Sequence, residues 1–250
     1  MNDEKPFRIG VRDVPKFYND FEGQRSGDGD SKSTTKDVRK ILDSLKTENV
    51  DGIIIDLRSD GGGSLQEAIE LTGLFIKEGP VVQVKNSDGN IDIAKDPDPS
   101  IVYDGPLAVL VNRFSASASE IFSGAIQDYG RGLIIGEQTY GKGTVQNLID
   151  LNRLSSKKDL NLGQVKLTIA KYYRINGGST QNLGVIPDIV FPSMIDPKDF
   201  GESSEPSALP WDEIKSADFN KFSDLSKFIP VLNTKHLERI STDKDFKYLL

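Results

Sequence analysis

The chain has 250 residues, of which 36% are hydrophobic, and a formal net charge of −7. This length is enough for a sizeable core in one large domain or two small ones. The acidic balance argues against nucleic acid as a partner, because phosphate binding needs a basic face. The absence of cysteine excludes disulfides, thiolate catalysis and cysteine metal sites, and no run approaches the ~18–20 apolar residues of a membrane span. We expect neither a cofactor nor a metal.

The first part of the chain carries signals for a strand, a loop and a helix. Residues 7–14, FRIGVRDV, alternate between apolar and polar and predict a strand. Residues 21–33 are polar and rich in Gly, Ser and Asp, which is typical of a mobile loop. In residues 33–50 the apolar side chains recur at helical spacing, and Ser33 or Thr34 is a suitable N-cap for that helix.

A strand, a Gly- or Ser-rich loop and a helix then follow one another twice. Residues 51–57, DGIIIDL, contain three consecutive isoleucines, as expected of a strand covered on both faces. The loop RSDGGGS and a helix over residues 65–79 come next. The order recurs with a strand at 106–111, a helix at 117–128 and a third buried strand at 133–135. This alternation predicts an α/β sheet with helices on its faces.

Three further strand signals fall outside these units. Residues 81–96 form two alternating segments around Asp88-Gly89 and predict a hairpin. Residues 144–151 and 164–173 read as two more strands.

The composition changes at Met194, after which Pro, Ser, Glu and Asp are frequent. We therefore predict two domains, a core over residues 1–194 and a C-terminal extension over residues 195–250. The extension is expected to be a loosely attached, extended arm followed by short helices.

The two Gly- and Ser-rich loops are candidate parts of one site, because sites in open α/β sheets form at the carboxyl ends of the strands. The loop at residues 60–64, DGGGS, and the loop around Ser117 both present backbone N–H groups at the start of a helix. If the two sets of donors converge, they form an oxyanion hole. The alternative is that residues 61–63 only turn the chain. A phosphate loop is disfavoured, since GGGS lacks the G-x-G-x-x-G spacing and the Walker lysine.

A serine nucleophile in RFSASASEIFSGAIQDYGRG, residues 113–132, needs a proton acceptor. The only histidine, His236, lies in the polar C-terminal region, where we expect a solvated surface residue. Lys142, between two glycines just after the third buried strand, is the better candidate. It can act as a base only when neutral, so its pKa must fall from ~10.4 to roughly 7–8 by desolvation. On the residues alone, a solvated lysine in a Gly-rich turn is the alternative.

Three long stretches occur in order: IIIDLRSDGGGSLQEAIELTGLFI, GPLAVLVNRFSASASEIFSGAIQDYGRGLIIGEQTYGKGTVQ and YYRINGGSTQNLGVIPDIVFP. With their separations, they resemble the carboxy-terminal processing proteases, also called tail-specific proteases, over residues 7–192. The resemblance is strongest to the bacterial periplasmic branch with an extended C-terminal region. It implies a mixed α/β fold with a crotonase/ClpP-like core of ββα repeats, and a serine endopeptidase without a cofactor.

The resemblance also assigns roles within the motifs. Ser117, the middle serine of FSASASE, corresponds to the nucleophile, and Lys142 in GKGTVQ corresponds to the base of a Ser–Lys pair. Gln146 completes the triad, and the backbone N–H groups of Gly63 and Ala118 form the oxyanion hole. An amide at Gln146 orients the lysine without adding a charge that would raise its pKa.

Three neighbouring residues receive weaker assignments. Ser115 and Ser119 are expected to be a turn residue and a helix-start residue. Asp128, in the QDYGR element, is linked to activity in the tail-specific branch, and a structural role is the alternative.

Members of this family carry a PDZ domain that binds the C-terminus of the substrate as an added strand. No stretch of this chain matches such a domain. The charged start MNDEKPFRIG is not a signal peptide. The resemblance therefore implies a protease core excised from a periplasmic parent. Its expected partners are proteins with apolar C-termini, the upstream PDZ domain and an adaptor or regulator.

Two other functions are compatible with the same fold. One is a catalytically silent module that binds peptides, which the loss of either Ser117 or Lys142 would favour, yet both are present. The other is acyl-CoA chemistry, for which no nucleotide site is evident.

Overall fold

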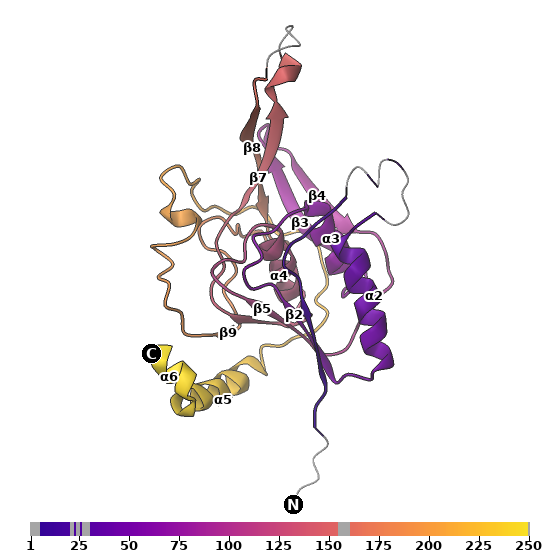
Figure 1. The fold of residues 1–250 in the computed structure, drawn as a ribbon, viewed down its shortest axis with the longest axis vertical. Helices are drawn as coiled ribbons and strands as arrows, with labels where there is room; N and C mark the ends of the chain where they lie inside the picture. The colour runs from indigo at the N-terminus through magenta and orange to yellow at the C-terminus, as the bar shows by residue number, and fades with distance from the viewer. Residues whose placement is uncertain (1–5, 21–22, 24–25, 27–30, 155–160, 250) are drawn as a thin grey trace, which may run out of the picture.

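The structure is a computed structural model that describes residues 6–20, 23, 26, 31–154 and 161–249 (Figure 1). Most of the mobile loop predicted at residues 21–33 lies outside the described residues. Two sheets, three helices packed against them and a long C-terminal region make up this part of the chain. Within it, no helix is both long enough and apolar enough to cross a membrane.

A five-stranded parallel sheet in the order β1-β2-β5-β6-β9 forms the centre of the fold. Its strands are β1 (Ile9–Asp13), β2 (Gly52–Asp56), β5 (Leu107–Val111), β6 (Leu133–Gly136) and β9 (Ile189–Val190). The helices between them are α2 (Thr34–Thr47), α3 (Leu65–Gly73) and α4 (Ala118–Asp128). The predicted α/β alternation is confirmed. Because the strands are parallel, the loops that follow them all open at one edge of the sheet.

The core lies between this sheet and the helices α3 and α4. Ile53 and Ile55 of the apolar run on β2 are buried. From the helix side, the rings of Phe75 and Phe122 meet edge to face with their centroids 5.9 Å apart. Aromatic pairs in this arrangement contribute beyond the area they bury.

The start of α2 agrees with the prediction from the sequence, whereas the end of α3 does not. The side chain of Ser33 accepts a hydrogen bond from the backbone N–H of Lys36, so Ser33 is the N-cap of α2. Helix α3 ends at Gly73, six residues before the predicted end at 79. The N–H of Leu74 bonds the Leu71 carbonyl in a tighter turn, and this turn directs the next apolar side chains into the core.

A second, antiparallel sheet in the order β4-β3-β8-β7 packs beside the first. Its strands are β3 (Gly79–Asn86), β4 (Ile91–Asp96), β7 (Thr144–Asp150) and β8 (Gln164–Tyr173). The hairpin predicted around Asp88-Gly89 is the β3–β4 pair. Strands β7 and β8, with the short 3-10 helix η1 (Leu151–Leu154), project away from the body as a hairpin (Figure 1).

The C-terminal region is bound to the core, so the expected loose attachment is wrong. It contains η2 (Glu202–Ser204), α5 (Ile229–Thr242) and α6 (Lys244–Leu249), joined by irregular stretches (Figure 1). Its hydrogen bonds with the core include Asn182 Nδ2 to the Leu209 carbonyl, Trp211 Nε1 to the Ser179 carbonyl and Phe222 N–H to the Tyr129 carbonyl, at 3.0, 2.9 and 2.7 Å. The polar composition concealed this docking because most of these contacts use backbone groups, which composition does not report.

His236 is buried in the structure, with 6% of its surface exposed, so the expected solvated position is also wrong. It lies on α5 and stacks on the ring of Phe191 with centroids 5.0 Å apart. Its Nε2 is 3.1 Å from the Val190 carbonyl, and its Nδ1 is 2.7 Å from a guanidinium nitrogen of Arg239. His236 therefore helps to dock α5 on β9, and it does not line the cavities described below.

Candidate active site

The loops that follow β2 and β5 converge at the carboxyl edge of the central sheet. The Asp60 carbonyl accepts a hydrogen bond from the Ala116 N–H at 3.0 Å and another from Ser119 Oγ at 2.8 Å. A Cβ added at Gly62 would lie 2.6 Å from the Ala116 carbonyl oxygen. Glycine is therefore needed at position 62 for the close approach of the two loops. Residues 61–63 thus bring the two loops together, in addition to turning the chain.

Ser117 occupies the N-cap of α4 with a strained backbone. Its φ of 59° and ψ of −112° lie outside the backbone regions that residues other than glycine usually adopt. Such strain costs on the order of 1–3 kcal/mol and persists only where the surroundings hold it. The neighbouring serines have structural contacts, as expected for a turn and a helix start: Ser115 Oγ donates to the Leu57 carbonyl at 2.8 Å, and Ser119 bonds Asp60.

The amides of Gly63 and Ala118 both belong to the wall of one cavity. Gly63 pairs with Phe17 in a parallel bridge that uses the carbonyl of Gly62 and the N–H of Ser64. Within the described residues, the N–H groups of Gly63 and Ala118 donate to no acceptor of the chain. Two such donors in one cavity are suited to bind an oxyanion.

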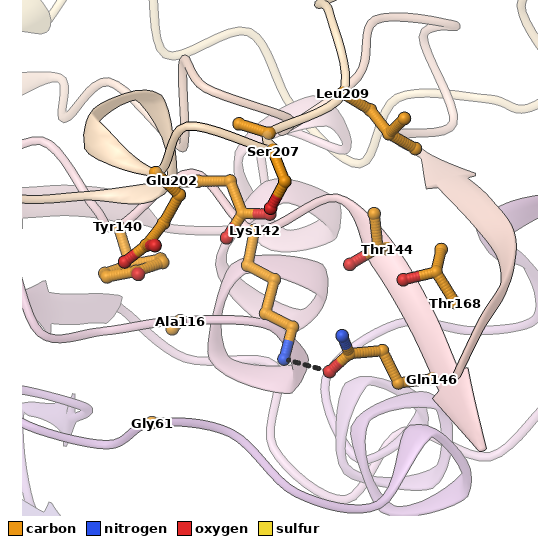
Figure 2. Close-up of a pocket in the computed structure, with 12 residues that line it drawn as sticks. Gly61, Ala116, Tyr140, Lys142, Thr144, Gln146, Thr168, Glu202, Ser207 and Leu209 are labelled. Atoms are coloured by element: carbon orange, nitrogen blue, oxygen red, sulfur yellow. Dashed lines mark hydrogen bonds between the residues drawn. The ribbon is translucent and has the colours of Figure 1, made fainter. Parts of the chain in front are cut away.

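Lys142 lies in the loop between β6 and β7. Its Nζ donates a hydrogen bond to Oε1 of Gln146, on β7, at 3.0 Å (Figure 2). Burial lowers the pKa of Lys142, and the nearby positive charge of Lys166 lowers it further, whereas Glu202 and Glu120 raise it. The structure places no hydrogen bond between Lys142 Nζ and Ser117, although both line the same cavity. Catalytic hydrogen bonds are often long before substrate binds.

The cavity that contains Ser117 and Lys142 has a volume of about 610 Å³. Its apolar wall consists of Leu65, Ala118, Ile121, Val145 and Tyr172. A second hollow of about 430 Å³ shares Lys142 and Gln146 with this cavity, and Glu202, Ser207 and Leu209 of the C-terminal region also line it (Figure 2). Among the described residues, no group of three or more His, Asp or Glu side chains is placed to hold a metal ion.

Glu120 joins the serine turn to the lysine loop, a role that the sequence reasoning missed. Its carboxylate is fully buried and accepts four hydrogen bonds. The donors are Ser117 N and Lys142 N at Oε2, and Gly141 N and Thr139 Oγ1 at Oε1, at 2.7, 3.0, 2.7 and 2.6 Å. Burial raises the pKa of Glu120 to about 7. The S-x-x-E spacing of a capping box, Ser117 to Glu120, was the available signal.

Two other buried side chains support the same backbone. The hydroxyl of Tyr172, on β8, bonds the carbonyl of Lys142 and is 3.3 Å from that of Ser117. Asp60 accepts a hydrogen bond from the Gly62 N–H at 2.7 Å, while its other carboxylate oxygen is buried and has no partner among the described residues. Burial raises the pKa of Asp60 to about 6. Buried polar groups thus hold both the Gly-rich loop and the lysine loop in place.

Asp128 is at the far end of α4 from Ser117, about 15 Å away for a helix of 11 residues. Its carboxylate forms an ion pair with Arg174 at 2.6 Å and accepts a hydrogen bond from Asn176 Nδ2 at 2.8 Å. Burial raises the pKa of Asp128, although the charge of Arg174 acts in the opposite direction. These contacts favour the structural alternative for Asp128.

The Asp128→Asn variant is expected to unfold more easily and to keep its turnover once folded. Removing one charge leaves the partly buried Arg174 without the counter-ion Asp128, which costs on the order of 1–3 kcal/mol. Urea denaturation measures this loss. Replacing Arg174 with methionine in the same chain is expected to recover part of it. A fall in kcat at unchanged stability would instead place Asp128 in the chemistry.

Comparisons with known proteins identify the class to which this fold and site belong. Residues 8–191 match the family described as Peptidase family S41, and the chain belongs to that family of serine-type peptidases. Residues 195–250 match the family described as the C-terminal domain of tail specific protease.

The chain is similar to the Tail-specific protease of Haemophilus influenzae, with 48% identity over 241 residues, covering 95% of this chain and 33% of that protein. It is 38% identical to the Carboxy-terminal-processing protease of Bartonella bacilliformis over 154 residues, covering 61% of this chain and 34% of that protein. The chain thus spans about a third of the length of the curated relatives it matches.

Solved structures support the same assignment. The photosystem II D1 C-terminal processing protease has a TM-score of 0.59 and 30% identity, covering 76% of this chain and 43% of that chain. Mature CPAF has a TM-score of 0.58 over 97% of this chain and 54% of its own, but at 16% identity it shows the fold alone. The mixed α/β fold class expected from the sequence is confirmed.

Proposed function

We propose that this chain is the catalytic core of a serine endopeptidase of the tail-specific, C-terminal processing type. The observation that carries the proposal is one cavity that holds a serine at a strained helix N-cap, a lysine of lowered pKa and two free amides. Membership of family S41 and the names of the relatives agree with it. Its substrates are proteins with apolar C-terminal tails.

The proposed mechanism uses a Ser–Lys pair. Neutral Lys142 takes the proton of Ser117 Oγ as the oxygen attacks a peptide carbonyl. Gln146 holds the lysine amine, and the N–H groups of Gly63 and Ala118 stabilise the oxyanion. Lys142 then protonates the leaving amine and afterwards removes a proton from the water that hydrolyses the acyl-enzyme. The apolar wall around Leu65 and Ile121 suits a small apolar side chain next to the cleaved bond.

The wider setting is also part of the proposal. Residues 1–194 form the catalytic domain and residues 195–250 the extension, which agrees with the separate matches to 8–191 and 195–250. The parent protein acts in the periplasm and captures the substrate C-terminus with an upstream PDZ domain, helped by an adaptor or regulator. A silent peptide-binding module remains the alternative, and only turnover separates the two.

The test combines turnover with a reagent that reports the nucleophile directly. A fluorophosphonate transfers its phosphonyl group to an activated serine oxygen, and fluoride leaves. We expect peptide masses to place this group on Ser117, and not on Ser115 or Ser119. We also expect an unfolded protein with an apolar C-terminal tail to be cleaved, both by the wild type and by His236→Ala protein.

Loss of labelling or cleavage in the folded His236→Ala variant would contradict the Ser–Lys mechanism. If the wild type is labelled but does not cleave, the assay is repeated with an upstream PDZ domain fused to the chain. If the fused protein then binds the unfolded substrate without cleaving it, the silent peptide-binding module is favoured.

A further inference from the structure

Arg113 is a fully buried cation, and in the described part of the chain all of its hydrogen bonds go to carbonyl groups. It lies in the turn between β5 and Ser117, and 1% of its surface is exposed. Its guanidinium donates to the carbonyls of Phe200 at 2.6 Å, Pro197 at 2.8 Å and Thr139. Burial lowers the pKa of Arg113. The charges of Glu120, Glu137 and Asp196 act in the opposite direction, although none of these carboxylates accepts a hydrogen bond from the guanidinium among the described residues.

These carbonyls come from two segments that are far apart in the sequence. Thr139 belongs to the loop that carries Lys142, whereas Pro197 and Phe200 belong to the C-terminal segment, which we define as residues 197–209. Arg113 itself is four residues before Ser117. The planar fork of an arginine can bind several acceptors at once, so one side chain connects three parts of the site.

Further contacts fix the same three parts together. The N–H of Tyr140 bonds the Ser115 carbonyl at 2.9 Å, and the carbonyl of Tyr140 accepts from the N–H of Glu202 at 3.0 Å. Gly201 has a φ of +141° and lies against the guanidinium. A Cβ at this position would collide with the guanidinium and lie 2.9 Å from the Tyr140 carbonyl. Glycine at position 201 therefore lets the backbone of the C-terminal segment lie directly against Arg113.

We propose that docking of the C-terminal segment on Arg113 sets the position of the Lys142 loop, and that Arg113 is a positioning residue for the reaction. This inference rests on the proposed function. Without the segment, Arg113 loses the carbonyls of Pro197 and Phe200, and a buried cation without its partners is strongly unfavourable. The side chain would then turn to solvent and release the Thr139 carbonyl. The lysine loop would then lose one of its anchors and keep those to Glu120 and Tyr172.

The same docking completes the cavity on the lysine side. Glu202, Ser207 and Leu209 line the same hollow as Lys142 (Figure 2). The charged groups that act on Lys142 are Glu202, Glu120 and Lys166. Release of the segment would remove the negative charge of Glu202 and admit water to the hollow. The C-terminal extension thus contributes both to the wall of the proposed catalytic site and to the charge near Lys142.

A matched control is available in Arg131, which follows the other end of α4. It is also buried and also binds carbonyls, donating to those of Phe75, Tyr103 and Gly105 at 2.8, 2.7 and 3.0 Å. The Arg113→Gln and Arg131→Gln variants remove the same charge from the same kind of site. Only the first is next to the lysine loop.

The primary measurement is hydrogen–deuterium exchange of the Gly141 and Lys142 amides, with the amides of β2 as the reference for global opening. We expect exchange of the two loop amides to become at least about tenfold faster in Arg113→Gln relative to β2. In Arg131→Gln we expect the exchange rates of the two loop amides and of the β2 amides to change by the same factor. The Gly201→Ala variant keeps Arg113 and pushes the C-terminal segment away from it. We expect its loop exchange to be accelerated as in Arg113→Gln, and it replaces that variant if Arg113→Gln does not fold.

The second measurement is the rate of Ser117 labelling by the fluorophosphonate. We expect about a hundredfold loss in folded Arg113→Gln, from misplacement of the base, and less than threefold in Arg131→Gln. Unchanged loop exchange in both Arg113→Gln and Gly201→Ala would overturn the inference, as would equal effects in Arg131→Gln. If the wild type is not labelled at all, the proposed function fails, and the exchange data still decide whether Arg113 positions the loop.

Discussion

The Lys142→Ala variant is expected to lose about 10⁴-fold or more in kcat, as much as Ser117→Ala loses. The serine oxygen is a weak nucleophile unless a base takes its proton, and Lys142 is the basic group beside Gln146 in the cavity of Ser117. Because the two residues act as a unit, the double variant should be no worse than either single one. Single-turnover cleavage of a peptide with an apolar C-terminus measures all three. Additive losses would show that Lys142 acts independently of the serine.

The pH dependence of the same reaction tests the protonation state of the lysine. Only neutral Lys142 can accept a proton, so kcat/KM should rise with pH through the pKa of Lys142 and level off above it. Burial and Lys166 lower this pKa. Lys166→Gln should therefore move the rise to higher pH, because it removes a like charge. Lys40→Gln, on the exposed face of α2, should leave the profile in place. A profile that falls with increasing pH would exclude a lysine base.

The Glu120→Gln variant is expected to lose both stability and about a hundredfold or more in kcat. Each carboxylate oxygen of Glu120 accepts two hydrogen bonds. The donors to Oε2 are the backbone amides of Ser117 and Lys142. An amide side chain replaces one of these oxygens with an NH₂ group, which then faces donors at a fully buried position. The strained turn at Ser117 and the lysine loop should both shift. The check is kcat and KM of the folded variant, with its free energy of unfolding from urea.

Glu67 provides the control for this effect. It is also a fully buried glutamate in the first turn of a helix, α3, and it accepts hydrogen bonds from Thr35, Ser33 and Asn19. Glu67→Gln should destabilise the fold by a similar amount and leave the kcat of the folded protein within a few-fold. Equal catalytic losses in the two variants would mean that Glu120 only stabilises the fold.

Buried polar residues around the site provide the environment that the proposed lysine base requires. Glu120 binds the amides of Ser117 and Lys142, while Tyr172 reaches the carbonyls of the same two residues. Arg113 adds the connection to the C-terminal segment. The lysine is therefore held half-buried, with its pKa lowered by burial, and no carboxylate among the described residues is bonded to its Nζ. Preorganisation of this kind requires no rearrangement at the moment of reaction.

Local patterns were sufficient to predict the elements that carry the site. The apolar run of β2, the Gly-rich loop and the helix α3 are successive in the chain, and each has a signal within a few residues. The same holds for Ser33 as the N-cap of α2 and for the β3–β4 hairpin. The parallel order of the strands then places the loops at one edge, so the convergence of residues 60–64 with Ser117 could be expected.

Contacts between distant residues decided what the sequence patterns could not predict. The burial of His236 depends on Phe191 and Val190, and the docking of residues 197–209 depends on Arg113. These interactions use backbone carbonyls and single polar side chains, which leave no periodic or compositional trace. Glu120 is intermediate, because its capping-box spacing is local while its bonds to Gly141 and Lys142 form only after folding. The sequence by itself thus determined most strands and helices of the core and which side chains are candidates for the reaction. Only the tertiary structure decided which buried polar groups hold those side chains in place, since that depends on which carbonyls and amides folding brings together.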